Sequence, residues 1–342
     1  MINEHITEFA DLPVVDFPSA DLEAERLRDL RYRARREGMP EPEEPGPDEA
    51  LDAALADPGS AAWRLRVSSY DPREPFEEYL ARFLAEVDTA EVGALVIGCW
   101  GDTAEKTLGG RVRDALLARA DRFPALRSLF FGEFLSEEAE ISWIRQTDVT
   151  PLLEGFPSLE EFTVRGGTGL GFHPVRHGGL RGLVVQTGGL PKEVTAGILA
   201  SDLPALEYLE LWLGVGHYGG DTSTGTLAPL LSGAALPELC HLGLRDAERT
   251  DDLVRALADA PVLEGLRSLD LSMGTLTDTG ARAVADSPAF RGLSRLDLSH
   301  HFLSRDRAAT LPSALPGVEV VLDDWRGEST PDKPSHYPSV TE

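Results

Sequence analysis

The chain has 342 residues, with 32 Lys and Arg against 58 Asp and Glu, so its formal net charge at pH 7 is −26. This excess of negative charge repels phosphate backbones and anionic lipid surfaces, which argues against nucleic acid and membranes as partners. No apolar run approaches the roughly 20 residues that span a bilayer, and the acidic first residues are unlike a signal peptide. We therefore expect a cytoplasmic protein.

The first 60 residues are predicted to precede a series of repeats. The apolar segment 9–17 has the pattern of a short strand, which could cover the edge of a sheet. Residues 22–36 are typical of a charged helix, and residues 41–48 are too acidic and too rich in proline to pack. We predict an amino-terminal cap over residues 1–21, and a charged helix with a mobile acidic linker over residues 22–60.

A phrase of the form Leu-x-x-Leu-x-Leu recurs along the rest of the chain. Clear copies begin at Leu126, Leu159, Leu180, Leu206, Leu239, Leu266 and Leu293, and looser copies begin at Ala62 and Val92. The six steps between the clear copies cover 167 residues, a mean period of about 28. Units of this kind bury their apolar face only by stacking on neighbours. We predict a leucine-rich repeat solenoid over residues 61–326, closed by a strand at 318–322, and a disordered tail over residues 327–342.

The unit that begins at Leu266 shows what each repeat contains. Its strand is followed by Thr277 or Asp278 as a helix cap, then by apolar residues at helical spacing, and Pro288 discourages the helix from continuing. The residues between Asp251 and Pro261 follow the same pattern. A strand and a helix in each repeat predict the α/β fold class.

The strand phrase, Leu276, the Gly280-Ala281 pair and the Val284-Ala285 pair resemble the ribonuclease-inhibitor-like class of leucine-rich repeats, over residues 60 to 325. The resemblance implies a horseshoe with a concave parallel β-sheet and convex helices. The chain departs from that class at the turn after each strand, where the class places Asn or Cys. Because Asn3 is the only asparagine, no asparagine ladder can form, and we expect irregular turns whose backbone groups are satisfied in other ways.

The strong catalytic motifs are absent from the sequence: it contains no nucleophile elbow, no His-Glu-x-x-His, no Cys-x-x-Cys and no phosphate-binding loop. We therefore predict a non-catalytic protein with no cofactor and no metal site. Two weaker candidates leave an enzyme or a small-ligand protein open as an alternative. They are the Gly166–His177 loop, with its glycines and two histidines, and Asp270 with Asp297, which share a register on neighbouring predicted strands.

Phrase positions three, five and seven point to the concave face of the sheet, while the leucines enter the core. Across the repeats these positions hold five arginines and four carboxylates, so this face is nearly neutral in a strongly acidic chain. Aromatic and arginine side chains dominate interface energetics. Our candidate binding residues are Phe130, Arg165, Gln186, Tyr208, Trp212 and Arg245. Trp212 and Arg245 share a register on adjacent strands, which predicts a cation–π contact.

The residues on the concave face predict an interaction module that binds a protein or peptide there. Two alternatives stay open. Trp212 could instead shield the sheet or pack beneath the Gly214–Thr226 loop, and a partner could instead dock on the acidic convex face of a scaffold subunit.

Overall fold

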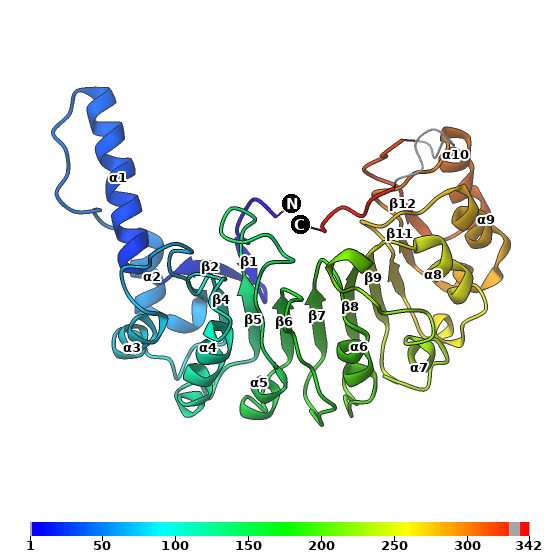
Figure 1. The fold of residues 1–342 in the computed structure, drawn as a ribbon, viewed down its shortest axis with the longest axis horizontal. Coiled ribbons are helices and arrows are strands. Elements are labelled where there is room, and N and C mark those ends of the chain that lie inside the picture. Colours follow the sequence, from blue (N-terminus) through cyan, green and yellow to red (C-terminus); the bar gives the residue numbers. More distant parts are fainter. Residues whose placement is uncertain (1, 328–335, 342) are drawn as a thin grey trace. The chain divides into compact units, whose positions relative to one another are not determined.

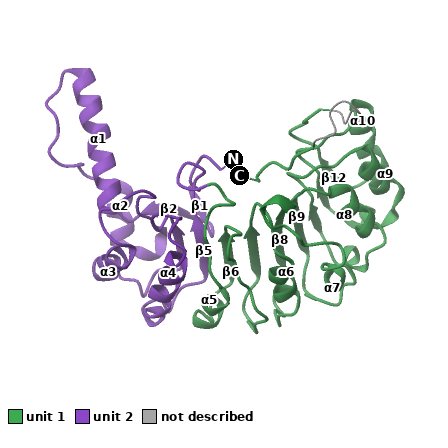
Figure 2. Cartoon of the chain, viewed as in Figure 1, with its two compact units in different colours: residues 1, 140–342 green, residues 2–139 purple. Residues whose placement is uncertain are grey.

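The computed structural model describes residues 2–327 and 336–341. The chain divides into two compact units, residues 2–139 and residues 140–342 (Figure 2). We call them the amino unit and the carboxyl unit. Within each unit the strands stand side by side in the order of the chain (Figure 1).

The amino unit contains five strands and the whole predicted segment 22–60 with its charged helix. Its strands are β1 (Glu8–Phe9), β2 (Leu12–Asp16), β3 (Ala62–Leu65), β4 (Ala94–Gly98) and β5 (Ser128–Glu133). Its helices are α1 (Ala20–Glu37), α2 (Glu49–Ala56), α3 (Phe76–Glu86) and α4 (Leu108–Leu117), with 3-10 turns η1 (Pro58–Ser60) and η2 (Ala120–Arg122). β1 and β2 form an antiparallel hairpin, and β2 to β5 are parallel. The predicted strand at 9–17 therefore extends the sheet beyond the first repeat.

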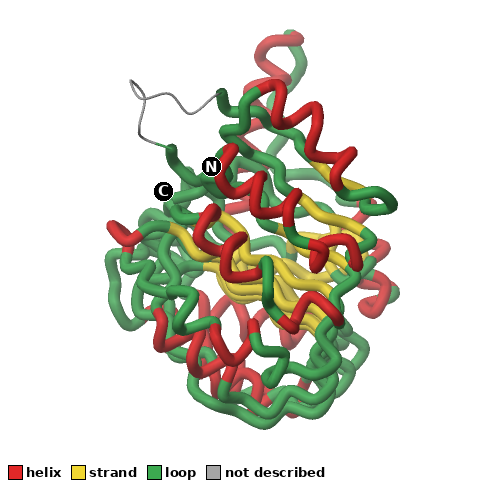
Figure 3. The backbone as a smooth tube through the Cα atoms, turned by 90° about the vertical axis from the view of Figure 1, so that its right-hand side faces the viewer, coloured by secondary structure: helices red, strands yellow, loops and turns green. Residues whose placement is uncertain are grey.

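The carboxyl unit carries the regular repeats. Its strands are β6 (Glu161–Arg165), β7 (Gly182–Gln186), β8 (Tyr208–Gly214), β9 (His241–Ala247), β10 (Ser268–Asp270), β11 (Arg295–Asp297) and β12 (Glu319–Val321). Its helices are α5 (Thr150–Gly155), α6 (Lys192–Leu199), α7 (Ala228–Leu231), α8 (Thr250–Leu257), α9 (Asp278–Asp286) and α10 (Arg305–Ala314), with 3-10 turns η3 (Gly216–Tyr218), η4 (Pro261–Glu264) and η5 (Pro288–Gly292). All of these strands are parallel. Figure 3 faces this unit and shows the strands as one layer with helices and loops beside it.

The register of the sheet follows the leucine phrase. Leu209 pairs with Leu242, Leu242 with Leu269, and Leu269 with Leu296, so the same phrase position lies side by side in successive strands. These leucines are buried, and burial of one such side chain stabilises the fold by about 1.5–3 kcal/mol. The predicted leucine-rich repeat fold of α/β class is thus confirmed.

The helix predicted in the best repeat is also present, as α9. Thr277 is its N-cap and accepts a hydrogen bond from the backbone N–H of Thr279. Ala281 and Val284 are buried at helical spacing, and Pro288 opens the 3-10 turn that follows.

Backbone hydrogen bonds replace the asparagine ladder at the turns. Asp246, Met273 and His300 occupy the same repeat position and have φ values of 55°, 66° and 64°. Their N–H groups donate to the carbonyls of Ser272, Ser299 and Asp323 in the next repeat. A left-handed residue at or just beyond the end of the strand thus directs its own N–H along the stack and satisfies it without an asparagine.

The linker and the tail were predicted to be mobile and disordered, but the described residues of both make contacts with the rest of the chain. Arg26 donates to Asp48 and Arg35 to Glu41, so the acidic linker lies along α1 because arginines of that helix pair with its carboxylates. In the predicted disordered tail, residues 336–341 contact the repeats of the carboxyl unit, as detailed below, and residues 328–335 and 342 lie outside the described residues. Within the described part of the chain, no helix combines the length and apolar character needed to span a bilayer.

Candidate binding surface

Phrase positions three, five and seven form one face of the sheet, which we call the polar face. In the amino unit this face is covered by the residues that precede the repeats. Phe130 is 3% exposed and its ring lies 6.0 Å from that of Phe9. Buried Glu133 accepts hydrogen bonds from the backbone N–H of Ile6 and from the ring of His5. Phe130 therefore packs beneath the cap, because the hairpin closes over it, and this position is poorly placed to meet a partner.

The other five candidate residues lie in the carboxyl unit, and three of them converge on Glu210. The Tyr208 hydroxyl donates to Glu210 Oε2 at 2.6 Å, and Trp212 Nε1 donates to Oε1 at 2.6 Å. Arg245 donates to the same Oε1 at 3.0 Å. The Arg245 guanidinium carbon lies 5.5 Å from the Trp212 ring centroid, so the predicted cation–π contact is confirmed.

Arg245 links this group to the next strand. Its Nε lies 3.0 Å from Ser272 Oγ and 3.2 Å from Asp270 Oδ2. Burial acts to lower the pKa of Arg245, but the carboxylates of Glu210 and Asp270 outweigh it and raise the pKa. The pKa of Tyr208 is also raised, first by burial and then by the adjacent Glu210 carboxylate. Arg245 thus stays charged and the Tyr208 hydroxyl stays protonated at physiological pH.

Burial separates the exposed candidates from the buried ones. Trp212 is 7% exposed, and buried Arg165 donates to Gln186 Oε1 at 2.8 Å. Tyr208, at phrase position three, is 40% exposed. At phrase position seven Arg165 and Trp212 are therefore buried while Gln186 and Arg245 are half-buried, and the most exposed candidate, Tyr208, lies toward the amino ends of the strands.

Two adjoining hollows lie on this face and share Tyr208 and His241. The larger, of about 440 Å³, is lined by Glu160, Glu161, Phe162, Thr163, Arg181, Gly182, Val184, Glu207, Tyr208 and His241. The smaller, of about 220 Å³, is lined by Tyr208, His241, Leu242, Gly243, Ser268, Leu269, Asp270, Arg295 and Asp297. Gly182 and Gly243 leave the floor without side chains between the strands on either side.

His241 and the two glycines were not among the predicted binding residues. The prediction rested on aromatic and arginine side chains, whereas the hollows arise where side chains are absent. Gly182 and Gly243 stand at phrase positions three and five, which face the polar side of the sheet. Glycine at such a position leaves space above the sheet, so the repeat pattern could have predicted the hollows.

The lining of the hollows is acidic. Five carboxylates and two arginines contribute to them. Arg181 pairs with Glu207 at 2.6 Å, and Arg295 pairs with Asp297 at 3.2 Å and also with Glu319. Both arginines are thus held by carboxylates of this chain, and the hollows offer a partner an excess of negative charge.

The sites of the alternative hypothesis are engaged in packing. A Cβ at Gly166, whose φ is 107°, would lie 2.7 Å from Ile144 side-chain atoms, so glycine is required by close approach of another segment. His177 is buried, with Nε2 3.3 Å from the carbonyl of Phe156. Residues 2–327 and 336–341 contain no group of three or more potential ligands placed to hold a metal ion. Asp270 is held by Arg245, as Asp297 is by Arg295.

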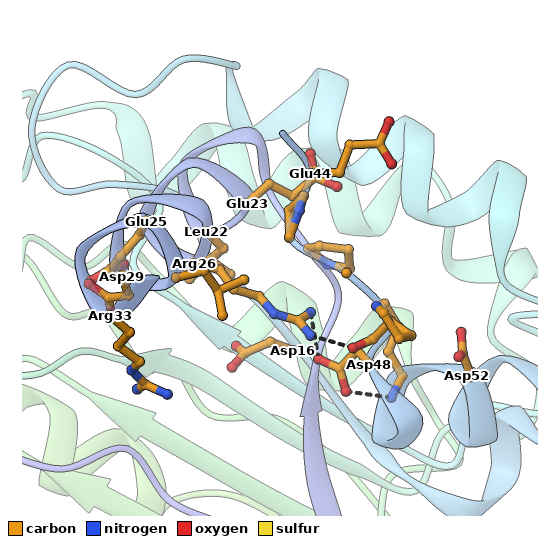
Figure 4. A pocket seen from close by; sticks show the side chains of 16 residues that line it. Asp16, Leu22, Glu23, Glu25, Arg26, Asp29, Arg33, Glu44, Asp48 and Asp52 are labelled. Atoms are coloured by element: carbon orange, nitrogen blue, oxygen red, sulfur yellow. Dashed lines mark hydrogen bonds and ion pairs between the residues drawn. The ribbon is translucent and has the colours of Figure 1, made fainter. Parts of the chain in front are cut away.

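The amino unit has a larger hollow, of about 890 Å³, between α1, the linker and α2 (Figure 4). Arg26 crosses it, with hydrogen bonds to Asp48 Oδ2 at 3.0 Å and to the carbonyl of Pro47 at 2.7 Å. The lining of the hollow, drawn in Figure 4, combines charged side chains such as Glu23 and Arg33 with leucines and prolines, from α1, the linker, β2 and α2. This hollow separates a helix from its own linker and lies away from the strand phrase.

Comparison with solved structures finds one that shares the fold of this chain. No protein-family model and no curated protein sequence matches the chain. A solved structure of a protein from Bacteroides fragilis is 28% identical, covers 89% of this chain and 84% of its own, and has a TM-score of 0.72. A leucine-rich repeat protein from Leptospira interrogans is 15% identical, with 81% of this chain and 58% of its own covered and a TM-score of 0.36.

Proposed function

We propose that this chain is a non-catalytic interaction module, and that its carboxyl unit binds a protein or peptide partner in the two hollows beside Tyr208 and His241. The observation that carries the proposal is the exposed Tyr208 ring between two glycine-floored hollows. Aromatic side chains next to a pocket are the usual anchors of protein interfaces. A carboxylate-lined surface in a chain of charge −26 favours a polypeptide over a nucleic acid or a lipid surface.

In this proposal the buried candidates position Tyr208. Glu210 holds the Tyr208 hydroxyl, and Trp212 and Arg245 fix Glu210 from the other side. The tyrosine ring is therefore presented in one orientation before a partner arrives, which reduces the entropic cost of binding. Arg165 and Gln186 act with them as part of the supporting layer.

The test is partner retention on immobilised protein, followed by mass spectrometry, with two tyrosine variants. We expect Tyr208→Ala to reduce retention of the partner at least tenfold, because it removes the exposed ring. Tyr70→Ala is the matched control, since Tyr70 is 85% exposed and lies in the amino unit. Both variants should keep the melting temperature within a few degrees of the wild type. Equal retention by the Tyr208→Ala variant and the wild type would contradict the assigned site.

A further inference from the structure

Residues 336–341, which we call the strap, lie across the turns that follow the strands of the carboxyl unit. The strap is the red segment that ends at C in Figure 1. Its backbone makes four contacts. Val340 N–H donates to Asp246 Oδ1 at 2.9 Å, and Ser339 N–H donates to the Met273 carbonyl at 2.8 Å. The Tyr337 carbonyl lies 3.2 Å from His300 Nε2, and the Thr341 carbonyl accepts a hydrogen bond from Ser142 Oγ at 2.6 Å. The strap is thus held largely through its main chain.

The surface beneath the strap is a row built from one repeat position. Asp246, Met273 and His300 are spaced 27 residues apart, and all three are non-glycine residues with positive φ. This conformation is uncommon and costs free energy, and it gathers at functional sites. Each of the three residues gives the strap one contact, through a carboxylate, a carbonyl or an imidazole. A regular row of this kind can form hydrogen bonds with the main chain of an extended segment that lies across it.

Two side chains of the strap enter the surface and two stay outside it. Pro338 and Val340 are buried, whereas Tyr337 and Ser339 are exposed. A Cβ at Gly188 would lie 2.0 Å from Ser142 Oγ and 2.6 Å from the Thr341 carbonyl, so the glycine there makes room for the hydrogen bond between these two groups. The groove therefore selects small apolar side chains two residues apart and accepts varied residues between them.

Asp246 shows that the strap does not satisfy the groove completely. Its side chain is fully buried, and among the described residues its Oδ2 atom has no hydrogen-bond partner. A buried polar atom without a hydrogen-bond partner destabilises the fold, and the strap does not supply a partner that would offset this cost. A ligand that places a polar group beside Oδ2 would bind the same groove better than the strap does.

We propose that this row is a peptide-binding groove, and that the strap is an internal occupant which an extended, uncharged Pro-x-Val-like segment of a partner protein replaces. The strap gains two buried side chains and a few hydrogen bonds, against the cost of ordering its backbone. Because the free energy gained from burial and hydrogen bonding is similar in size to the entropic cost of ordering the strap, a competing peptide can displace it. The groove is separate from the hollows beside Tyr208, so this proposal does not depend on their function.

The test uses the full chain with Ser339→Pro and Val340→Asp, which removes one N–H donor and places a charge where Val340 is buried. A fluorescent peptide with the sequence of residues 336–341 is titrated into this released variant and into the wild type, with anisotropy as the readout. We expect at least tenfold tighter binding to the released variant, because in the wild type the tethered strap competes at a high effective concentration. The peptide with Ser339→Ala should bind as well as the native peptide, and the peptide with Val340→Asp at least tenfold more weakly.

Two results would overturn the proposal. One is peptide binding to the released variant that is no tighter than binding to the wild type. The other is equal binding of the native and Val340→Asp peptides. If the double variant lacks a cooperative melt, the single Ser339→Pro variant is titrated in the same way. Failure of both variants to fold would show that the strap belongs to the core, and this would also contradict the proposal that a partner segment can replace it. None of these results depends on Tyr208, so they are distinguishable from failure of the proposed function.

Discussion

Buried carboxyl groups play two different roles in the carboxyl unit. Glu210 receives hydrogen bonds from Tyr208, Trp212 and Arg245, so its charge is compensated where it lies. Asp246 is as deeply buried, but the hydrogen bonds that reach it come from backbone N–H groups of the strap, and its Oδ2 has no partner among the described residues. A buried carboxyl with so little compensation favours its neutral form, and its ionisation is therefore linked to the stability of the fold.

Burial raises the pKa of Asp246 to about 8, although the Val340 N–H and Arg245 act in the opposite direction. In the unfolded chain this carboxyl loses its proton near pH 4. Between about pH 4 and pH 8 the folded state thus holds a proton that the unfolded state has released, and stability falls as pH rises. We expect Asp246→Asn, which cannot ionise but keeps an acceptor for Val340, to match the wild type near pH 4. At pH 8 it should exceed the wild-type unfolding free energy by up to about 5 kcal/mol, since each unit of pKa difference is worth about 1.4 kcal/mol.

Urea denaturation at several pH values between 4 and 8 measures this difference. Asp259→Asn, at an exposed position, is the control and should follow the wild-type curve. Parallel curves for wild type and Asp246→Asn would show that Asp246 ionises equally easily in the folded and unfolded states.

At the scale of elements, carboxylates join the starts of successive helices in the carboxyl unit. Asp251 at the start of α8 accepts from the N–H and hydroxyl of Thr277, and Asp278 at the start of α9 accepts from the N–H and hydroxyl of Ser304. The two aspartates are one repeat apart, and the hydroxyl residues they hold are the N-caps of α9 and α10. Each link therefore fixes the start of one helix to the start of the next.

Removal of one such link should weaken the stack. Asp278→Ala deletes the acceptor of two hydrogen bonds from Ser304 and leaves a partly buried N–H without a protein partner, which we expect to cost about 1–3 kcal/mol of unfolding free energy. Asp286→Ala, at the exposed far end of α9, is the matched control and should change stability by less than about 0.5 kcal/mol. Chemical denaturation followed by circular dichroism measures both, and equal midpoints for the two variants would exclude a structural role for the link.

The same elements show how far the sequence could predict the structure. Periodic leucines located the strands, and the apolar spacing after Thr277 located α9, because both patterns report burial directly. The strap could not be predicted, since its polar contacts are made by backbone atoms and its two buried side chains are too few to form a periodic pattern. The site was predicted only in part. The contact between Trp212 and Arg245 followed from register, but the burial of Trp212 depends on how its ring packs with Glu210 and Arg245, which the repeat pattern does not specify.

At the scale of the molecule, one repeat architecture carries two kinds of polar face. In the amino unit the cap covers the face, and Phe130 packs against Phe9. In the carboxyl unit the face keeps its hollows, with Tyr208 exposed between them. We infer that the first face serves stability and the second is free for recognition.

The net charge of −26 also acts on the molecule as a whole. Repulsion among carboxylates favours expansion of the chain, and salt screens it over a Debye length of roughly 8–10 Å at physiological ionic strength. Exposed ion pairs such as Arg181–Glu207 are weakened by the same salt, but each contributes at most about 1 kcal/mol. We therefore expect the melting temperature to rise by several degrees when NaCl increases from about 10 mM to about 150 mM, measured by calorimetry at pH 7. Sucrose of equal osmolality is the control for solvent effects, and a melting temperature that falls with salt would mean that ion pairs outweigh the net repulsion.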